Sequence, residues 1–305
     1  MKKLALLLCL LLPALLAHGQ TSQPEPRDTL ILGKISDDPR TDLEGMRPLI
    51  DWVTGQMGDV GITRGDIMLA DNAREMIALL ETGQVDWVAE TIGMGLFLSS
   101  KTGADIVLER WKHGEEAYRS VLFVKKNSPI ERLEDLLGNT VAFEHPGSTT
   151  GFMIPALEMY RRGLPIVLMR NPSEQPDPET IGYFFSGDEI NTSTWVHRGS
   201  VQGGALADTD WSRPYQVPSS FQDDFKVIFR SEPLPRAVEL VRKDMDPAVR
   251  ERLLQILTTA HESERGRQLM RRFQRTTRFK PYDPEEWPYA SALLPDLIKM
   301  LDEVR

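Results

Sequence analysis

Short apolar runs alternate with amphipathic segments from residue 29 onward, and this alternation limits the fold more than any other feature of the sequence. A strand is predicted at 29–33, and the pattern after a polar loop predicts a helix that contains Leu43, Met46 and Leu49 on one face. The order then repeats, with a strand at 67–69, a helix at 72–82 and a strand at 85–89. Because strands that alternate with helices form mainly parallel sheets, we expect an α/β fold.

Polar loops follow the first three predicted strands, at 36–38, 71–72 and 90–91. Ligands of parallel sheets bind beyond the carboxyl ends of the strands. We therefore expect Asn72, Glu90 and Thr91 to lie at the rim of a ligand site.

The rest of the chain continues the mixed pattern. We predict strands at 119–126, 139–143, 225–230 and 236–242, and helices at 130–137, 152–162, 192–198, 246–270 and 289–304. About 285 residues would remain after removal of a leader, more than one core comfortably supports, so we expect two domains or lobes.

A polar turn that contains Ser148, Thr149, Thr150 and Gly151 joins the strand at 139–143 to the helix at 152–162. Hydroxyl groups beside the unpaired N–H groups of a helix start suit an oxyanion, and the flanking glycines allow close approach to the backbone. An ordinary helix cap uses the same residue types, and these residues alone do not decide between the two. The turn is neither a G-x-S-x-G nucleophile elbow nor a phosphate-binding loop with its lysine.

The first 19 residues have the features of a signal peptide. Two lysines precede an apolar stretch at 4–16, and Ala17-His18-Gly19 forms a small-x-small cleavage site. The alternative is a membrane anchor, but the stretch is shorter than the roughly 20 residues that a spanning helix needs. We expect a signal peptide at 1–19, a flexible leader at 20–28 and a periplasmic protein.

Composition excludes several kinds of function. The formal net charge is -9, which argues against nucleic acid as a partner. Cys9, the single cysteine, lies within the predicted signal peptide, and the histidines show no metal-binding spacing, so we expect neither a metal nor a cofactor. No pair of nucleophile and base is visible, which argues against an enzyme.

Residues 120–155, SVLFVKKNSPIERLEDLLGNTVAFEHPGSTTGFMIP, resemble the middle of the phosphate, phosphite and phosphonate-binding proteins of ABC importers. Shorter family-like pieces occur at 33–38, 83–86, 118–121, 231–235 and 241–244. The resemblance implies a two-lobed type II periplasmic-binding-protein fold in which each lobe is a mainly parallel sheet flanked by helices. Lobe 1 would comprise 29–117 and 236–305, and lobe 2 would comprise 118–235, with the chain crossing near Tyr118 and Pro235.

The resemblance also implies roles for individual residues. Ser148, Thr149 and Thr150 would receive the oxyanion, Gly151 would keep the helix start open, and Tyr118 would line the cleft at the crossing. The chain departs from the family pattern at Asn72, Glu90, Asp188 and Glu189. The three acids could form a wall that pairs with the amine of a zwitterionic ligand, or they could be solvated loop residues. Both interpretations stay open at this point.

The expected function is that of a monomeric binding protein without catalytic residues. It would capture a small anionic or zwitterionic ligand, such as a phosphonate or a related organophosphorus compound, by closing its lobes, and would deliver it to an ABC permease. The alternative is a periplasmic sensor subunit of the same fold that presents its liganded form to a membrane-bound signalling receptor.

Overall fold

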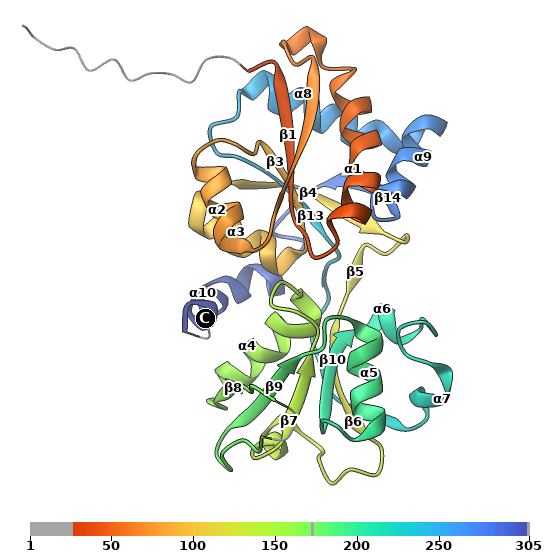
Figure 1. Ribbon diagram of the computed structural model, residues 1–305. Coiled ribbons are helices and arrows are strands. Elements are labelled where there is room, and N and C mark those ends of the chain that lie inside the picture. Colours follow the sequence, from red (N-terminus) through yellow and green to blue (C-terminus); the bar gives the residue numbers. More distant parts are fainter. Residues whose placement is uncertain (1–26, 172–173, 304–305) are drawn as a thin grey trace, which may run out of the picture.

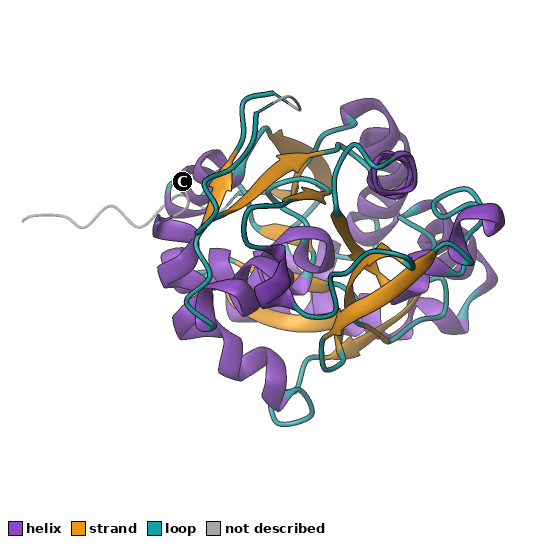
Figure 2. Cartoon of the chain, turned by 90° about the horizontal axis from the view of Figure 1, so that it is seen from below, coloured by secondary structure: helices purple, strands orange, loops and turns teal. Residues whose placement is uncertain are grey.

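The computed structural model describes residues 27–171 and 174–303 and shows two α/β lobes, one above the other (Figure 1). The predicted signal peptide at 1–19 and residues 20–26 of the predicted leader lie outside the described residues. Each lobe contains a six-stranded sheet, and Figure 2 shows helices on both sides of the strands. The expected α/β fold with two mainly parallel sheets is confirmed.

Lobe 1 is built on a sheet with the strand order β14-β4-β13-β3-β1-β2. Strands β1, β2, β3 and β4 point one way, and β13 and β14 run antiparallel to them. Its strands are β1 (Thr29–Ile35), β2 (Arg64–Ala70), β3 (Trp87–Glu90), β4 (Asp105–Lys112), β13 (Val238–Val241) and β14 (Thr276–Pro281). Its helices are α1 (Pro39–Thr54), α2 (Ala73–Glu81), α3 (Ile92–Thr102), α8 (Pro247–Thr259) and α9 (Glu264–Arg272), with short 3-10 turns at Gly58–Val60 and Ala260–Glu262.

Lobe 2 has the strand order β11-β6-β10-β7-β9-β8, in which only β6 runs against the others. Its strands are β6 (Ser120–Lys125), β7 (Thr140–Phe143), β8 (Ile166–Leu168), β9 (Ile181–Phe185), β10 (Gly203–Ala207) and β11 (Phe225–Arg230). Its helical segments are a 3-10 turn (Leu133–Leu136), a π-helical turn (Thr149–Met153), α4 (Ile154–Arg161), α5 (Glu189–Arg198), α6 (Asp208–Trp211) and α7 (Ser219–Gln222).

Two short strands join the lobes. Strand β5 (Ala117–Tyr118) pairs antiparallel with β12 (Leu234–Pro235), so the chain leaves lobe 1 and returns to it side by side. The pairing includes Tyr118 and Pro235, and we call it the hinge.

Local sequence signals explain why several helices begin at the rim of the cleft between the lobes. The side chains of Asp38 and Asn72 accept hydrogen bonds from the N–H groups of Thr41 and Glu75, and they cap α1 and α2. Asp188 caps α5 in the same way. Such caps satisfy N–H groups that have no acceptor within their helix, so polar residues collect where strands give way to helices.

The single helix predicted at 246–270 is wrong, because α8 and α9 are separated by a 3-10 turn and a new cap at Ser263. A Cβ atom on Gly266 would lie 2.0 Å from the carbonyl oxygen of Ala260. Only glycine permits this close approach of α9 to the carbonyl group of Ala260, which accompanies the break. The helix predicted at 130–137 is also shorter than expected, being a 3-10 turn at Leu133–Leu136.

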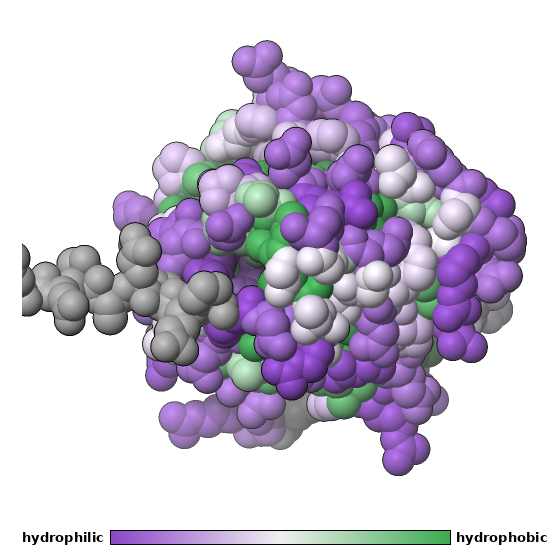
Figure 3. Space-filling model, turned by 90° about the horizontal axis from the view of Figure 1, so that it is seen from above, coloured by the Kyte–Doolittle hydropathy of each residue, from purple (hydrophilic) through white to green (hydrophobic). Residues whose placement is uncertain are grey.

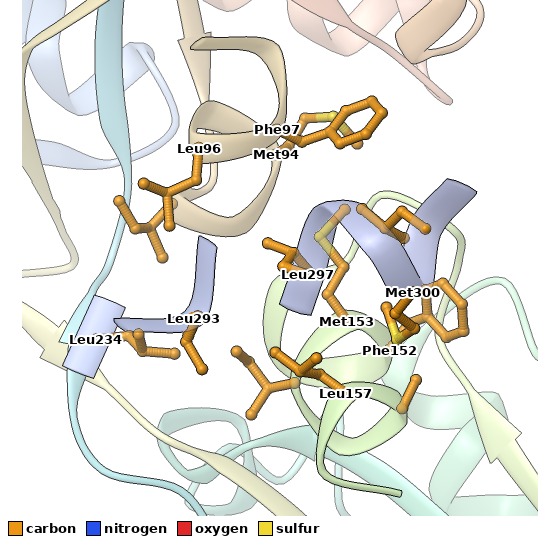
Figure 4. Close-up of a cluster of buried hydrophobic side chains, with 14 of the residues drawn as sticks. Met94, Leu96, Phe97, Phe152, Met153, Leu157, Leu234, Leu293, Leu297 and Met300 are labelled. Atoms are coloured by element: carbon orange, nitrogen blue, oxygen red, sulfur yellow. The ribbon is translucent and has the colours of Figure 1, made fainter. Parts of the chain in front are cut away.

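Helix α10 (Pro288–Glu303) bridges the two lobes (Figure 1). Its apolar side chains join those of α3 in lobe 1 and those of α4 and the π-helical turn in lobe 2, in one continuous buried cluster. Figure 4 shows this cluster, with Met94, Leu96 and Phe97 on one side, Phe152, Met153 and Leu157 on the other, and Leu293, Leu297 and Met300 between them. Burial of these side chains against each other stabilises the arrangement of the two lobes.

Two ion pairs tie α10 to the lobes, one at its middle and one near its C-terminal end. Lys101 of α3 lies 2.8 Å from Asp302, and Arg161 of α4 lies 2.7 Å from Asp296. Seen from above, the surface is mostly hydrophilic with small apolar patches (Figure 3). Among the described residues, no helix combines the length and the apolar character that crossing a membrane requires.

Candidate functional site

A cavity of about 770 Å³ lies between the lobes and in front of the hinge. Lobe 1 contributes the loops that follow β1, β2 and β3, and lobe 2 contributes the turn that follows β7. The carboxyl ends of the strands therefore face a shared cleft, as parallel sheets favour. A volume of this size holds a ligand much larger than a single phosphate group.

The turn at 148–150 lines this cleft and begins with a cap. The hydroxyl group of Ser148 accepts from the N–H group of Gly151 at 2.9 Å and donates to the carboxylate of Glu144 at 2.6 Å. The helix starts with a π-helical turn, a rare conformation that is frequent at functional sites. Thr149 and Thr150 open the helix, so their N–H groups have no intrahelical acceptor.

Thr149 and Thr150 differ in what their side chains contact. The hydroxyl oxygen of Thr149 accepts from the N–H group of Gly93, at the start of α3, at 2.9 Å. The carbonyl oxygen of Thr150 accepts from the hydroxyl group of Ser120 at 2.6 Å, but the Thr150 hydroxyl has no hydrogen bond within the described chain. Thr150 therefore supplies the hydroxyl of this turn that is unoccupied by other groups of the protein.

The two lobes touch at this turn. Besides the bond between Gly93 and Thr149, the hydroxyl group of Thr91 lies 3.5 Å from the carbonyl oxygen of Gly147. A Cβ atom on Gly93 would lie 2.8 Å from both the Met153 sulfur and the Thr149 hydroxyl oxygen. Glycine at position 93 is thus what permits this approach.

The structure brings most of the predicted site residues together. Those that line the cleft are Asn72, Glu90, Thr91, Tyr118, Ser148, Thr149, Thr150 and Glu189. Gly151 and Asp188 do not line it. Gly151 packs against Glu144, with no room for a Cβ atom, and Asp188 serves as the cap of α5.

The acidic wall considered from the sequence is only partly present. Glu90 is buried, and its two oxygens accept from the N–H groups of Ile35 and Thr91, so it organises the backbone of lobe 1. Burial raises the pKa of Glu90. Glu189 does face the cleft, where burial and the nearby charges of Glu144 and Asp210 raise its pKa to about 7.

His145 and Glu144 form an ion pair beside the turn. The Nε2 atom of His145 lies 3.4 Å from Glu144, and its Nδ1 atom accepts from the N–H group of Gly147 at 3.2 Å. Burial alone would lower the pKa of His145 and raise that of Glu144. The hydrogen bond and the opposite charges outweigh burial, so the pKa of His145 rises and that of Glu144 falls.

Sequence reasoning missed the basic residues of the cleft. Lys34, Arg74, Arg110, Lys112 and Arg236 all line it. Two of them carry a signal in the sequence, because Lys112 lies five residues before the first crossing strand and Arg236 directly follows the second. Residues that flank crossing strands face the back of the cleft, and charged ones there are candidates for ligand contact.

One group of carboxylates has the spacing of a metal site but is already neutralised. Oxygen atoms of Glu109, Glu116 and Glu286 lie within 4.8 Å of one another. The ammonium group of Lys280 lies 3.3 Å from both Glu109 and Glu116 and is hydrogen-bonded to Glu286. The lysine therefore supplies the positive charge that this group requires.

Comparison with known proteins gives a consistent result. A family model described as the periplasmic substrate-binding protein of phosphonate ABC transporters matches residues 33–287. The chain is 36% identical to XAC2383 from Xanthomonas citri, in a structure bound to a chloride ion, with a TM-score of 0.86 over 91% of this chain and 100% of that one.

A second structure of XAC2383 is bound to ATP and is 35% identical, with a TM-score of 0.85 over 92% of this chain and 100% of that one. PhnD1 from Prochlorococcus marinus in complex with methylphosphonate shares the fold at 16% identity, with a TM-score of 0.62 over 87% of this chain and 97% of that one.

Proposed function

The chain belongs to the family of periplasmic substrate-binding proteins of phosphonate ABC transporters, and from this we propose that its cleft binds a phosphonate or a related phosphorus oxyanion. Members of this family bind small anionic ligands and work with an ABC permease. Family membership does not identify the ligand of this chain, and the phosphonate or related oxyanion is our proposal.

One observation carries the proposal. Thr149 and Thr150 open a helix and line a cleft that both lobes line, and their two N–H groups and the Thr150 hydroxyl are free of intrahelical partners. The positive end of the helix dipole and these donors favour an anion with several acceptor oxygens. A tetrahedral phosphonate group offers three such oxygens, and it can receive bonds from all three donors.

Closure of the lobes accounts for capture. The bond between Gly93 and Thr149 exists only when the lobes meet, and a ligand in the cleft contacts both lobes only in that form. Its differential affinity then shifts the population toward the closed shape, which a membrane partner can recognise.

We also propose the cellular setting. A signal peptide at 1–19 would bring the chain to the periplasm, where it would act as a monomer without catalysing a reaction. The partner would be an ABC permease. A membrane-bound signalling receptor, with the chain as a sensor subunit, is the alternative, and co-purification with membrane proteins encoded by neighbouring genes would distinguish the two.

A nucleotide is a second candidate ligand. The related XAC2383 has been determined with bound ATP, and the cavity of about 770 Å³ has room for more than a small alkylphosphonate. The phosphate groups of a nucleotide would use the same donors of the turn.

Isothermal titration calorimetry tests the proposed function directly. The panel comprises inorganic phosphate, phosphite, methylphosphonate, 2-aminoethylphosphonate, methanesulfonate, AMP and ATP. We expect one or more phosphorus compounds to bind and to raise the unfolding temperature, since a ligand of the native state stabilises it. Absence of binding by every phosphorus compound would contradict the proposal.

Replacing Thr150 by valine should weaken methylphosphonate binding by about 1.5–2 kcal/mol, roughly 10- to 30-fold, because a hydrogen bond to a charged group is lost without a change of shape. Thr150→Ser keeps the hydroxyl and is the matched control, with an expected loss below about 0.5 kcal/mol. Equal affinities of Thr150→Val and the unchanged protein would show that Thr150 does not contact the ligand.

A further inference from the structure

Lys112 lies in the cleft without a partner for its charge. It ends β4 just before the chain crosses to lobe 2, and it lines the cavity. Within the described part of the chain, its ammonium group makes no hydrogen bond and no ion pair. Burial and the nearby charges of Arg236, Arg110 and Lys34 lower its pKa to about 7. The protein thus holds this lysine where its own cations disfavour a positive charge.

Arg236 lies on the return crossing and has one long ion pair, with Glu115. Its guanidinium group lies over the ring of Tyr118 at 4.6 Å, and its side chain is 11% exposed. The Nε atom is buried without a hydrogen bond, and Glu115 is 3.7 Å away, too far for one. The hydroxyl group of Tyr118 is likewise buried, with the Thr149 hydroxyl group nearby.

Arg213 already occupies two carboxylates that could neutralise these cations. It lies 2.5 Å from Asp210 and 3.0 Å from Glu115. A buried charge whose counterions are distant or shared with another cation destabilises a fold. An incoming anion would give Lys112 a counterion and Arg236 a closer one.

We propose that Lys112, Arg236 and the Tyr118 hydroxyl form a second anion subsite at the hinge side of the cleft, so that the preferred ligand carries two anionic groups. The first group caps the helix start at 149–150, and the second binds the two cations. The ligand class is an organophosphorus compound with two separate anionic groups, such as a diphosphonate or a phosphate ester with a further phosphate. This inference rests on the proposed function, because it assumes that the turn receives the first group.

The subsite has a consequence for the ligand-free protein. The pKa of Lys112 is lower in the folded chain than its ordinary value of 10.5, so the unfolded chain binds more protons between about pH 7 and 10.5. Stability from this group is therefore lost as the pH falls through that window. Removing the charge by Lys112→Met should leave the unfolding temperature of the free protein at pH 7 unchanged or higher, whereas loss of a structural lysine would lower it.

The test compares methylphosphonate with a series of diphosphonates whose two groups are joined by one to six methylene carbons. Calorimetry measures the dissociation constant of each for the unchanged protein, Lys112→Met and Arg236→Gln. Lys126→Met, at an exposed position directly after β6 and outside the cleft, controls for the loss of one positive charge. We expect at least one diphosphonate to bind about tenfold or more tightly than methylphosphonate.

In Lys112→Met and Arg236→Gln, the diphosphonate should bind less than about threefold more tightly than methylphosphonate. The affinity for methylphosphonate itself should change by less than about threefold. Lys126→Met should retain the full advantage. The subsite is overturned if no diphosphonate binds more tightly than methylphosphonate, or if Lys112→Met weakens both kinds of ligand equally. Failure of every probe to bind overturns the proposed function and this inference with it, so the two failures are distinguishable.

Discussion

Replacing Gly93 by alanine should hold the lobes apart and weaken methylphosphonate binding by about 2–3 kcal/mol, roughly 30- to 150-fold. The new Cβ atom would lie 2.8 Å from the Met153 sulfur and 2.8 Å from the Thr149 hydroxyl oxygen. Met153 can move its side chain, but Thr149 is fixed by the hydrogen bond that it accepts from residue 93 itself. Since both contacts cross from lobe 1 to lobe 2, the cost falls on forms in which the lobes meet at this point.

Calorimetry gives the affinity, and small-angle X-ray scattering with saturating ligand reports the shape. Gly93→Ala should require more ligand to reach the compact form than the unchanged protein does. Gly58→Ala is the matched control, because nothing lies within 4 Å of a Cβ atom there. An unaltered affinity of Gly93→Ala would mean that ligand binding does not depend on this contact between the lobes.

Replacing Arg110 by leucine should lower the free energy of unfolding at pH 8 by about 3–5 kcal/mol, because it breaks a buried ion pair and leaves Glu239 without a counterion. Arg110 and Glu239 are 1% and 0% exposed, and the Nε atom of Arg110 donates to Glu239 at 2.5 Å. The second oxygen of Glu239 accepts from Trp87 at 2.6 Å. One hydrogen bond remains in the variant, but no positive charge offsets the carboxylate.

The loss of unfolding free energy in Arg110→Leu should depend on pH. Burial raises the pKa of Glu239 to about 7, and Arg110 opposes that rise. Without Arg110 the pKa rises further, so the folded variant binds more protons than the unfolded chain above the ordinary pKa of glutamate. Its stability therefore improves as the pH falls from 8 to 5.

Urea denaturation at pH 8 and pH 5 measures both effects. Arg250→Leu is the control, because it removes an arginine whose ion pair with Asp105 is 37% and 50% exposed and should cost less than about 1 kcal/mol. Equal deficits of Arg110→Leu at the two pH values would show that Glu239 does not carry the effect.

The sequence predicted the parts of the fold that depend on local pattern. Strands and helices between residues 29 and 90 follow from apolar spacing, and the hydroxyl-rich turn is visible as a helix start. Strand β4 was missed because its interior contains Glu109 and Arg110, which are buried only through partners far along the chain. A pattern of apolar residues cannot reveal a strand whose buried charges are neutralised by tertiary contacts.

The site also contains residues that local sequence predicts and residues that only the fold brings together. Ser148, Thr149 and Thr150 are consecutive, so their role follows from local structure. Lys112 and Arg236 are far apart in sequence and come together only because β5 pairs with β12. Asp188 was predicted to contact the ligand, but it caps α5 instead. An acid directly before a helix is explained by the need of the first N–H groups for an acceptor.

Helix α10 gives the two lobes a third link, and this restricts the direction in which the molecule can open. Rotation about β5 and β12 alone would separate α10 from α3 or from α4 and expose the apolar cluster between them to water. An axis that passes close to both the hinge and α10 keeps that cluster buried. The entrance for the ligand should then widen on the side of the molecule away from α10, which makes the C-terminal helix a determinant of the route by which ligand enters and leaves.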